Sequence, residues 1–522
     1  MPELQIMNKT LINHRKAFGQ FFTPPPVASI MAQWVLSNDP ETILDPAFGL
    51  GVFYHEVKKL RSSRKLRFTG YEIDEKILDN FDGEKHRDDL FLRNEDYLAA
   101  NSGKYDGIIC NPPYFRFQKF LNRHNVLPQI EKQIGRKLAG YTNISSVFLV
   151  KALNELNNNG NLAFIMPFEF FNTGYGEEIK KSLLQNNLLK QIIVFSNEKD
   201  IFPEATTTVC VLLCSKDNQQ ADIKIAKIQS VEELASIENV CDYYQKTIQP
   251  CDLPPEKKWT PIITSLFSEN FVPESFVKLS FYGSFSRGIA TGANEFFALN
   301  KAKILKLGID QKNLCKCVTR SAQIRKPVFS DEDFENLYCA DKPVFCLNVA
   351  DANDHKVKKY LSEGEKSGFN QRYLTSKRSP WYRIEKRNPA PILIGVFNRG
   401  RLKVIRNLTD AVNFTCFHCF IPNIRGRKTV NKIFVYFLSD LGQKTIKMNR
   451  RCYGNNLDKF EPGDLNESLC PNEDQFGKID DSEAEKVIEM AKTDEESAIK
   501  YSNDLIQRIL FHKDRNALEK KF

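Results

Sequence analysis

The sequence of 522 residues contains no apolar run long enough to cross a bilayer and no apolar segment typical of a signal peptide. Its longest apolar runs, such as Ile192–Phe195 and Val209–Leu213, have the length of β-strands, whereas a membrane-spanning helix needs about 20 residues. The first twenty residues place charged side chains between single apolar ones, unlike a secretory signal. We therefore expect a cytoplasmic protein with no membrane association.

Internal repeats and low-complexity segments are also absent, which argues against solenoid, collagen-like and disordered proteins. The 13 cysteines are an odd number in a chain without an export signal, so reduced thiols are expected rather than a disulfide framework. The apolar fraction of 42% and the charged fraction of 27% are ordinary for a globular protein. A chain of this length suggests two to four domains.

The net charge of +9 is distributed unevenly along the chain. Residues 371–410 carry ten basic residues against two acids (+8), and residues 421–460 carry nine against two (+7), which leaves −6 for the rest. Aromatic residues, among them Trp381 and Tyr453, lie within these runs. Basic clusters with interleaved aromatics favour a surface that binds a polyanion such as nucleic acid over a merely solvated face.

The first half alternates strand-like and helical patterns. The sequence predicts strands near residues 42–44, 68–72, 105–110, 160–167, 191–195 and 207–214, with helices near 52–60, 75–80, 145–157 and 179–189. This order indicates an α/β fold with a doubly wound, mostly parallel sheet. Residues 215–275 are polar and contain several prolines, so we interpret them as the end of the sheet and a connection. Short β-like runs follow from about residue 276, and the tail from residue 482 to about 511 is predicted to be helical.

A glycine-rich turn, Asp45–Gly51 (DPAFGLG), stands where the first strand should give way to a helix. Such a turn lets the backbone approach a nucleotide-like ligand closely, although glycines also serve simple packing turns. The third glycine of the dinucleotide fingerprint is missing, so a nucleoside cofactor other than NAD is favoured. Glu72 stands at the end of the next predicted strand, where an acid can bind both ribose hydroxyls.

The segment Asn111–Tyr114 (NPPY) ends the third strand and is the most specific signal in the chain. The Asn111 side chain and the Pro112 carbonyl are two acceptors that together can hold both hydrogens of an aromatic amino group. This would localise the lone pair on the nitrogen and make it nucleophilic. Tyr114 offers a face on which a planar base can stack. A plain proline-rich turn is the alternative, but a turn alone does not require Asn before Pro-Pro and an aromatic after it.

These motifs, in this order and spacing over about residues 17–215, resemble the adenine-N6 DNA methyltransferases of the γ arrangement (the TaqI-like group). The resemblance implies a Rossmann-like class I methyltransferase domain (residues 1–250), a mixed α+β target-recognition domain that binds DNA (276–470) and a helical tail (471–522). It also implies S-adenosylmethionine (SAM) as cofactor and methyl transfer to N6 of an adenine flipped out of double-stranded DNA. No metal is needed for this reaction.

The resemblance also assigns roles to single residues. Thr23, in the segment Phe18–Pro24, would contact the methionine part of SAM, Glu72 the ribose, and Asp96 the adenine amino group. The catalytic residues would be Asn111, Pro112 and Tyr114, and Phe202 would pack with Tyr114 against the flipped base. The full set expected to bind the cofactor is Thr23, Asp45, Ala47, Gly49, Gly51, Glu72, Ile73, Asp96, Tyr97 and Asn111. The residues expected to bind DNA are Arg287, Arg378, Trp381, Arg399, Arg401, Arg427, Arg450 and Arg451.

Two alternatives stay open at this point. The same NPPY chemistry occurs in enzymes that methylate RNA adenine or a protein glutamine, and a DNA-binding subunit could have lost the activity. The long basic second half favours DNA, and the intact motifs favour an enzyme. A separate cognate restriction endonuclease is a candidate partner, and a monomer is the simplest expectation.

A zinc site is the last hypothesis that the sequence raises. Cys416 and Cys419 have C-x-x-C spacing, and Cys315 and Cys317 would complete four ligands. Four zinc ligands must converge in a tetrahedron, and a β-like run with buried thiols explains the pattern as well. We therefore expect no metal.

Overall fold

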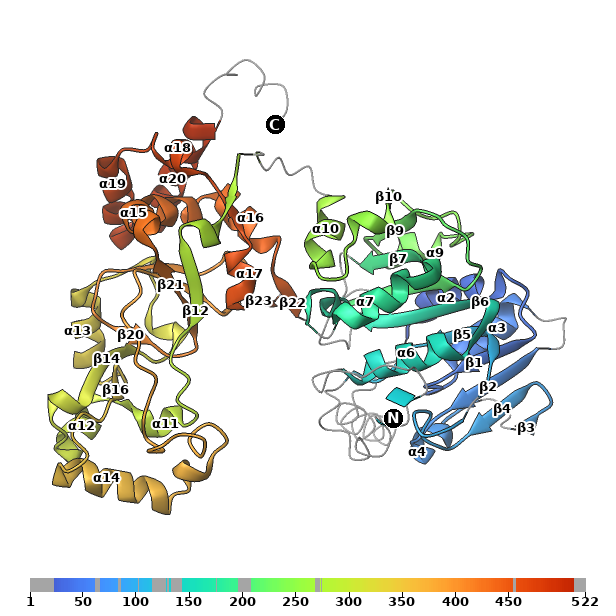
Figure 1. The fold of residues 1–522 in the computed structure, drawn as a ribbon, viewed down its shortest axis with the longest axis horizontal. Coiled ribbons are helices and arrows are strands. Elements are labelled where there is room, and N and C mark those ends of the chain that lie inside the picture. The colour runs from blue at the N-terminus through green and yellow to red at the C-terminus, as the bar shows by residue number, and fades with distance from the viewer. Residues whose placement is uncertain are drawn as a thin grey trace, which may run out of the picture. The chain divides into compact units, whose positions relative to one another are not determined.

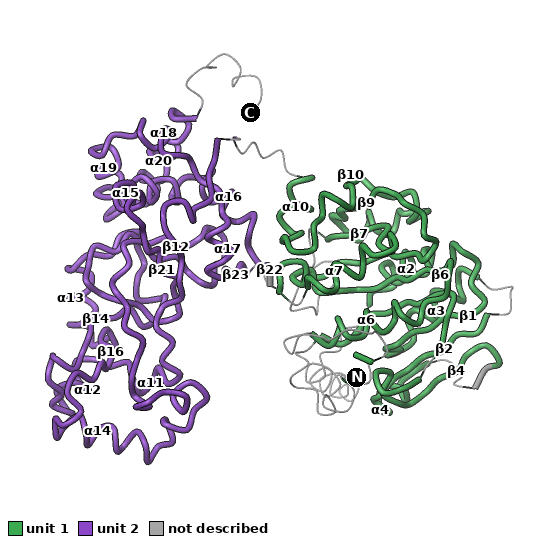
Figure 2. Tube along the Cα trace, viewed as in Figure 1, with its two compact units in different colours: residues 1–268, 452–455 green, residues 269–451, 456–522 purple. Residues whose placement is uncertain are grey.

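The computed structural model describes residues 23–61, 66–82, 86–101, 103–114, 128, 131–132, 143–174, 176–195, 208–267, 273, 275–453 and 457–510. The chain divides into two compact units (Figure 2): unit 1 comprises residues 1–268 and 452–455, and unit 2 comprises residues 269–451 and 456–522. The segment that we set apart as a helical tail, 471–522, belongs to unit 2, and its described residues, which end at Leu510, contribute to the core.

Unit 1 contains a ten-stranded sheet (Figure 1). In spatial order the strands are β10 (Lys246–Ile248), β9 (Ile223–Ile228), β7 (Leu189–Phe195), β8 (Val209–Ser215), β6 (Leu156–Pro167), β5 (Tyr105–Cys110), β1 (Thr42–Asp45), β2 (Arg67–Tyr71), β4 (Leu90–Arg93) and β3 (His86–Arg87). The strands β6, β5, β1, β2 and β4 run parallel. The predicted α/β fold with a mostly parallel sheet is confirmed, and β8 is antiparallel to both of its neighbours.

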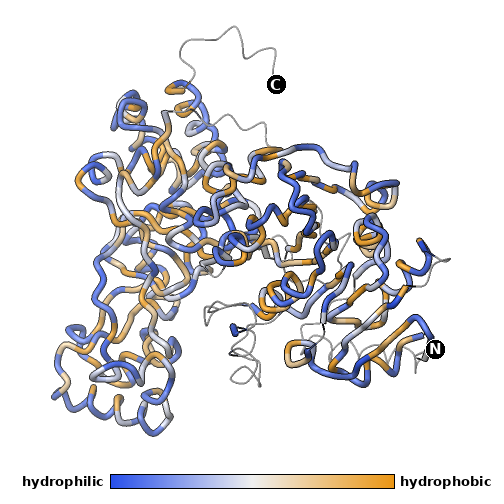
Figure 3. The backbone as a smooth tube through the Cα atoms, turned by 45° about the vertical axis from the view of Figure 1, so that its right-hand side comes forward, coloured by the Kyte–Doolittle hydropathy of each residue, from blue (hydrophilic) through white to orange (hydrophobic). Residues whose placement is uncertain are grey.

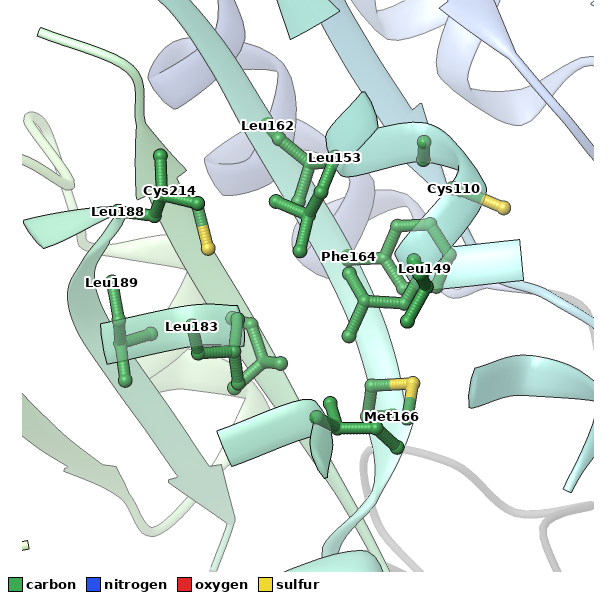
Figure 4. Packing of buried hydrophobic residues seen from close by; sticks show 14 of the residues in the cluster. Cys110, Leu149, Leu153, Leu162, Phe164, Met166, Leu183, Leu188, Leu189 and Cys214 are labelled. Carbon is green, nitrogen blue, oxygen red and sulfur yellow. The ribbon is translucent and has the colours of Figure 1, made fainter. Parts of the chain in front are cut away.

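Helices cover the sheet on both faces, because alternate strand residues enter two separate cores. Ile108 of β5 lies in one core, and its neighbour Ile109 lies in the other. In the first core, residues of α6 pack against β6 (Figure 4). The helices of unit 1 are α2 (Pro25–Leu36), α3 (Val52–Leu60), α4 (Glu75–Leu78), α6 (Ile144–Glu155), α7 (Gly176–Leu184), α9 (Val231–Ala235) and α10 (Trp259–Ser265).

Two late strands of this unit were not predicted. We interpreted residues 215–275 as the end of the sheet and a connection, and β9 and β10 add two strands to the sheet there. The sequence Ile223–Ile228 (IKIAKI) buries Ile223, Ile225, Ala226 and Ile228. The strand pairs with β7 on one side and with the short β10 on the other.

Unit 2 is built from small sheets and helices, in agreement with the predicted α+β domain. A five-stranded sheet contains β12 (Gly283–Arg287), β21 (Phe417–Pro422), β17 (Ile392–Gly395), β19 (Val404–Asn407) and β15 (Val328–Phe329). A four-stranded sheet contains β13 (Ala298–Leu299), β16 (Phe345–Leu347), β14 (Leu314–Val318) and β20 (Val412–Asn413). The remaining strands are β11 (Val277–Lys278) with β24 (Leu469–Cys470), and β18 (Phe397–Asn398) with β23 (Leu457–Lys459) and β22 (Arg451–Tyr453).

The helices of unit 2 fall into two groups. One packs around the five-stranded sheet: α15 (Ile424–Leu438), α16 (Asp440–Lys447), α17 (Pro462–Asn466), α18 (Glu473–Phe476), α19 (Asp481–Thr493) and α20 (Glu495–Leu510). The other surrounds the four-stranded sheet: α11 (Asn294–Phe297), α12 (Lys301–Leu307), α13 (Asp331–Cys339) and α14 (His355–Lys366).

Hydrophobic stretches are short and alternate with hydrophilic ones along the coloured parts of the backbone (Figure 3). In the part of the chain that the structure describes, we find no helix with the length and apolar character required to span a membrane.

Candidate active site

The predicted site residues follow the carboxyl ends of four neighbouring parallel strands. Asp45 ends β1, Glu72 follows β2, Asp96 follows β4 and Asn111 follows β5. These strands are adjacent in the order β5-β1-β2-β4. Ligands of open α/β sheets bind outside the carboxyl ends of the strands. The fold therefore brings the four motifs to one edge of the sheet, although they are spread over 66 residues of sequence.

The glycine-rich turn connects β1 to α3. Gly49 and Gly51 have positive φ angles of 57° and 79°, and Gly51 stands at the N-terminus of α3. This left-handed backbone explains why glycine occupies these positions. Asp45 is fully buried, and one of its carboxylate oxygens accepts a hydrogen bond from the Ala47 N–H at 3.0 Å. Burial raises the pKa of Asp45 well above its usual value.

Glu72 joins the glycine-rich turn to the segment after β2. Its two carboxylate oxygens accept hydrogen bonds from the Gly49 N–H and the Asp74 N–H, both at 3.0 Å. The side chain is 7% exposed, and burial raises its pKa. The adjacent Ile73, in contrast, is 59% exposed. This side chain, which the resemblance assigns to the cofactor, is therefore accessible to a ligand.

Asp96 belongs to a tight turn after β4. Its Oδ1 accepts a hydrogen bond from the Leu98 N–H at 3.0 Å, and burial raises its pKa. Its Oδ2 is buried without a hydrogen-bond partner, as is Oδ2 of Asp45. A buried carboxylate oxygen without a donor is costly. Two such oxygens at one sheet edge indicate a ligand that carries hydrogen-bond donors.

A buried network anchors the Asp96 turn to helix α6. Lys151 is 1% exposed, forms an ion pair with Glu155 one turn later, and donates to the Ala100 carbonyl at 2.9 Å. Tyr97 donates from its hydroxyl to Glu155 at 2.7 Å, and Lys151 lies 4.6 Å from the centre of the Tyr97 ring. Burial, followed by the Glu155 carboxylate, raises the pKa of Tyr97, so the hydroxyl stays protonated.

In this network the Tyr97 side chain points toward Glu155 of helix α6. We assigned Tyr97 to the cofactor, but its side chain is 2% exposed and lies in the hydrophobic core against Tyr71. Sequence analysis missed Lys151 and Glu155, because an i, i+4 pair of opposite charge usually marks a solvent-facing helix surface.

Asn111 hydrogen-bonds to two side chains. Its Nδ2 donates to Thr23 Oγ1 at 3.0 Å, and its Oδ1 accepts from the Tyr114 hydroxyl at 2.6 Å. Thr23 is buried just before α2 and lies 88 residues from Asn111 in the sequence. Tyr114 packs against the core on the α2 side of the sheet, and burial raises its pKa. Phe202, predicted to stack on the target base, lies outside the described residues, as do residues 18–22.

The residues predicted to bind DNA all lie in unit 2 or at its boundary, and most have partners within the protein. Salt bridges connect Arg287 to Glu461, Arg401 to Asp440, Arg450 to Asp458 and Arg451 to Asp464. Arg378 donates to the carbonyls of Ala290 and Thr291, and the Trp381 indole donates to Glu365. Within the described residues, neither Arg399 nor Arg427, both exposed, has a salt bridge. Their roles toward DNA remain predictions.

The C-x-x-C segment forms part of β21. Cys419 is buried, and His418 shares a hydrogen bond with the Phe460 carbonyl at 2.8 Å. Among the residues that the structure describes, no group of three His, Cys, Asp or Glu side chains could hold a metal ion.

Two family models match consecutive parts of the chain. The model "N-6 DNA Methylase" matches residues 4–250, and the model for the C-terminal domain of the type II methyltransferase M.Eco57I matches residues 262–507. The N6 methylase family uses SAM. The boundary between the two matches falls close to the boundary between units 1 and 2.

Individual relatives give the same result, and a solved structure shares the fold. The type II methyltransferase M.AccI of Acinetobacter calcoaceticus is 37% identical over 494 residues, which cover 92% of this chain and 90% of the relative. M.XamI of Xanthomonas campestris pv. amaranthicola is 22% identical over 474 residues, or 87% and 85% of the two chains. The structure of the type IIL restriction–modification enzyme MmeI in complex with DNA matches this chain with a TM-score of 0.54 at 13% identity. The match covers 99% of this chain and 74% of that one, and it supports the fold. The chain belongs to the type II DNA adenine-N6 methyltransferases of restriction–modification systems.

Proposed function

We propose that the chain binds SAM at the carboxyl edge of β5, β1, β2 and β4 and transfers its methyl group to N6 of an adenine rotated out of double-stranded DNA. The observation that carries this proposal is the convergence of Asp45, Glu72, Asp96 and Asn111 at that edge. Two of these residues have a buried carboxylate oxygen without a partner.

The chemistry of the residues fits SAM, whose ammonium, ribose hydroxyls and adenine amino group are all hydrogen-bond donors. Asp96 Oδ2 is assigned to the adenine amino group, and Glu72 is assigned to the ribose. Ile73 supplies the exposed apolar contact for the adenine ring. Thr23, buried beside Asn111, is placed to contact the methionine part. When bound, SAM supplies an activated methyl group that a nitrogen can attack.

The chain's own contribution to the reaction is positioning and hydrogen bonding. Asn111 Oδ1 and the Pro112 carbonyl accept the two hydrogens of the target amino group. Thr23 Oγ1 accepts from Asn111 Nδ2 and so keeps Oδ1 directed away from Thr23, toward the target. The Tyr114 ring stacks on the extruded base, which offsets part of the cost of unstacking.

The target base can be tested for extrusion with a duplex in which 2-aminopurine replaces the methylated adenine. Stacking quenches the fluorescence of 2-aminopurine, so extrusion should raise it several-fold when wild-type protein and S-adenosylhomocysteine are added. The control is a duplex in which 2-aminopurine lies three base pairs from the target adenine. Equal signals from the two duplexes would argue against extrusion of the target base.

Changing Asp96 to asparagine should weaken SAM binding. Two donors, the Leu98 N–H and the cofactor's amino group, would then compete for one side-chain oxygen, and the negative charge would be lost. Hydrogen bonds to charged groups contribute about 1.5–3 kcal/mol, so we expect the Kd for SAM to rise by about 10- to 150-fold in isothermal titration. The control is Glu238→Gln, which makes the same charge change at an exposed position of unit 1. An unchanged Kd for Asp96→Asn would remove Asp96 from the cofactor site.

Tyr114 should tolerate phenylalanine better than alanine. Its hydroxyl donates to the same Asn111 oxygen that is proposed to accept from the target amino group, and an amide oxygen can accept two hydrogen bonds. Tyr114→Phe keeps the ring and loses a hydrogen bond worth about 0.5–1.5 kcal/mol, so kcat should stay within about tenfold of the wild type. Tyr114→Ala loses stacking worth about 1–3 kcal/mol and should lower kcat/KM for DNA by about 5- to 150-fold. Equal effects of the two changes would argue against stacking.

We further propose that the protein acts as a monomer with a separate cognate restriction endonuclease. The supporting observation is that the two matched families, a methylase and a methyltransferase C-terminal domain, account for most of the chain. Light scattering of the purified protein should give the mass of one chain, 60.1 kDa, and a dimer mass would contradict this part of the proposal.

A further inference from the structure

Unit 2 contains a pocket that none of the motifs above uses. It lies between the segment leading into β15 and helix α13, and its volume is about 500 Å³. Pockets of about 300–1,000 Å³ are typical of ligand sites. Its lining includes apolar side chains from β15 and the preceding segment, among them Ile324, Val328 and Phe329, all of which are buried.

Four basic side chains, from Arg320, Arg325, Lys326 and Lys342, also line this pocket, and all four residues are exposed. Over the described ranges of the chain, none of the four forms a salt bridge. This distinguishes them from Arg287, Arg401 and the other arginines that are neutralised by nearby acids. Both clusters of basic residues that the sequence revealed, 371–410 and 421–460, lie outside this segment.

The acids near the pocket leave the positive charge largely uncompensated. Asp333 is the only acid in the lining, and its carboxylate accepts hydrogen bonds from the Ser330 N–H and hydroxyl at 3.0 and 2.8 Å, where it caps α13. Asp331, at the start of the same helix, forms a salt bridge in which its Oδ1 lies 3.7 Å from Lys316 Nζ. The remaining acids of α13 are not part of the lining.

We propose that this pocket, defined by Arg320, Arg325, Lys326 and Lys342, binds backbone phosphates of the substrate DNA. These phosphates belong to nucleotides other than the target adenine. Arginine forks and lysine ammonium groups are the usual partners of phosphate oxygens. The apolar floor suits the deoxyribose that lies between successive phosphates. Phosphate contacts fix the register of a protein on the duplex, so the pocket would hold the DNA while other residues read the bases. The inference rests on the proposed function, since it takes DNA as the ligand.

The test compares two double variants that remove the same charge. Arg325→Ala/Lys326→Ala changes the pocket, whereas Lys358→Ala/Lys359→Ala changes two exposed lysines of α14 that are not part of the lining. The Kd for a duplex that the wild type methylates is measured over a range of KCl concentrations. Each lost phosphate contact should reduce the slope of log K against log salt by about 0.9. The pocket variant removes two such contacts, so the magnitude of its slope should be smaller by about 1.8. Its Kd for the duplex at low salt should be at least about tenfold higher.

Several outcomes decide the question. The control variant should keep the wild-type slope, and circular dichroism should show that both variants are folded. Equal slopes for the two variants would overturn the pocket proposal. If the wild type still transfers label from SAM to the duplex, that failure concerns the pocket alone. If the wild type neither binds nor methylates any DNA, the proposed function itself fails.

A second measurement separates DNA from a free phosphate compound as the ligand. Hydrogen exchange of residues 320–329 is followed with the duplex and, separately, with inorganic pyrophosphate. Protection by the duplex supports the proposal. Protection by pyrophosphate but not by the duplex would overturn the assignment to DNA.

Discussion

Asn111→Ala is expected to lower the rate of methyl transfer to DNA by at least about 100-fold while DNA binding changes little. The target nitrogen gains positive charge as it attacks the methyl group, so its hydrogens become stronger donors in the transition state. A hydrogen bond to Asn111 Oδ1 that strengthens in the transition state raises kcat rather than affinity. Single-turnover transfer of tritium from labelled SAM measures the rate, and fluorescence anisotropy of the duplex measures the Kd.

Thr23→Val gives a graded comparison for this prediction. Valine has the shape of threonine but cannot accept the hydrogen bond from Asn111 Nδ2 at 3.0 Å, so the amide can rotate away from its productive orientation. We expect a smaller loss in the rate of methyl transfer, on the order of tenfold, because one neutral hydrogen bond contributes about 0.5–1.5 kcal/mol.

If Asn111→Ala weakens DNA binding as much as it slows turnover, Asn111 supports the structure rather than the reaction.

Lys151→Met should lower the free energy of unfolding by about 3–5 kcal/mol, because it removes one partner of a buried ion pair. Lys151 and Glu155 are 1% and 7% exposed, so the remaining Glu155 carboxylate would lie in the core without its cation. The Ala100 carbonyl would lose its donor as well. Urea denaturation followed by circular dichroism measures the change, provided that the transition of unit 1 is resolved from that of unit 2.

The double variant Lys151→Met/Glu155→Gln tests this explanation. Glutamine keeps an oxygen for the Tyr97 hydroxyl but removes the buried charge, so the double variant should be more stable than Lys151→Met alone. Additive losses from the two single changes would contradict the coupling. Both variants are also expected to bind SAM more weakly, since the network holds the turn that carries Asp96.

Much of unit 1 could be predicted because its signals are local. A strand such as Tyr105–Cys110 is a short apolar run that ends at Asn-Pro-Pro, and the turn at Gly49 and Gly51 requires left-handed backbone that glycine adopts most easily. The parallel arrangement then places the residues after each strand at one edge. The strands β4 and β9 were missed because β4 has only four residues and because two lysines interrupt the apolar residues of β9.

The pairing of charged residues, in contrast, could not be predicted from local sequence signals. Arg287 is 174 residues from Glu461, and Arg401 is 39 residues from Asp440, so a count of charges along the chain cannot reveal that they are paired. The basic residues of the pocket, Arg320 and its neighbours, which form no salt bridge with any described residue, lie beside an acidic helix in the sequence and leave no net positive run.

The sequence by itself determined the α/β class and the order of the motifs that contain Asp45, Glu72, Asp96 and Asn111, because residue type and local spacing carry that information. Only the tertiary structure decided that Tyr97 faces the core, that Lys151 and Glu155 are buried beneath the Asp96 turn, and that Thr23 fixes the Asn111 amide. These contacts join residues up to 88 positions apart, and their partners become known only when the sheet brings distant segments together.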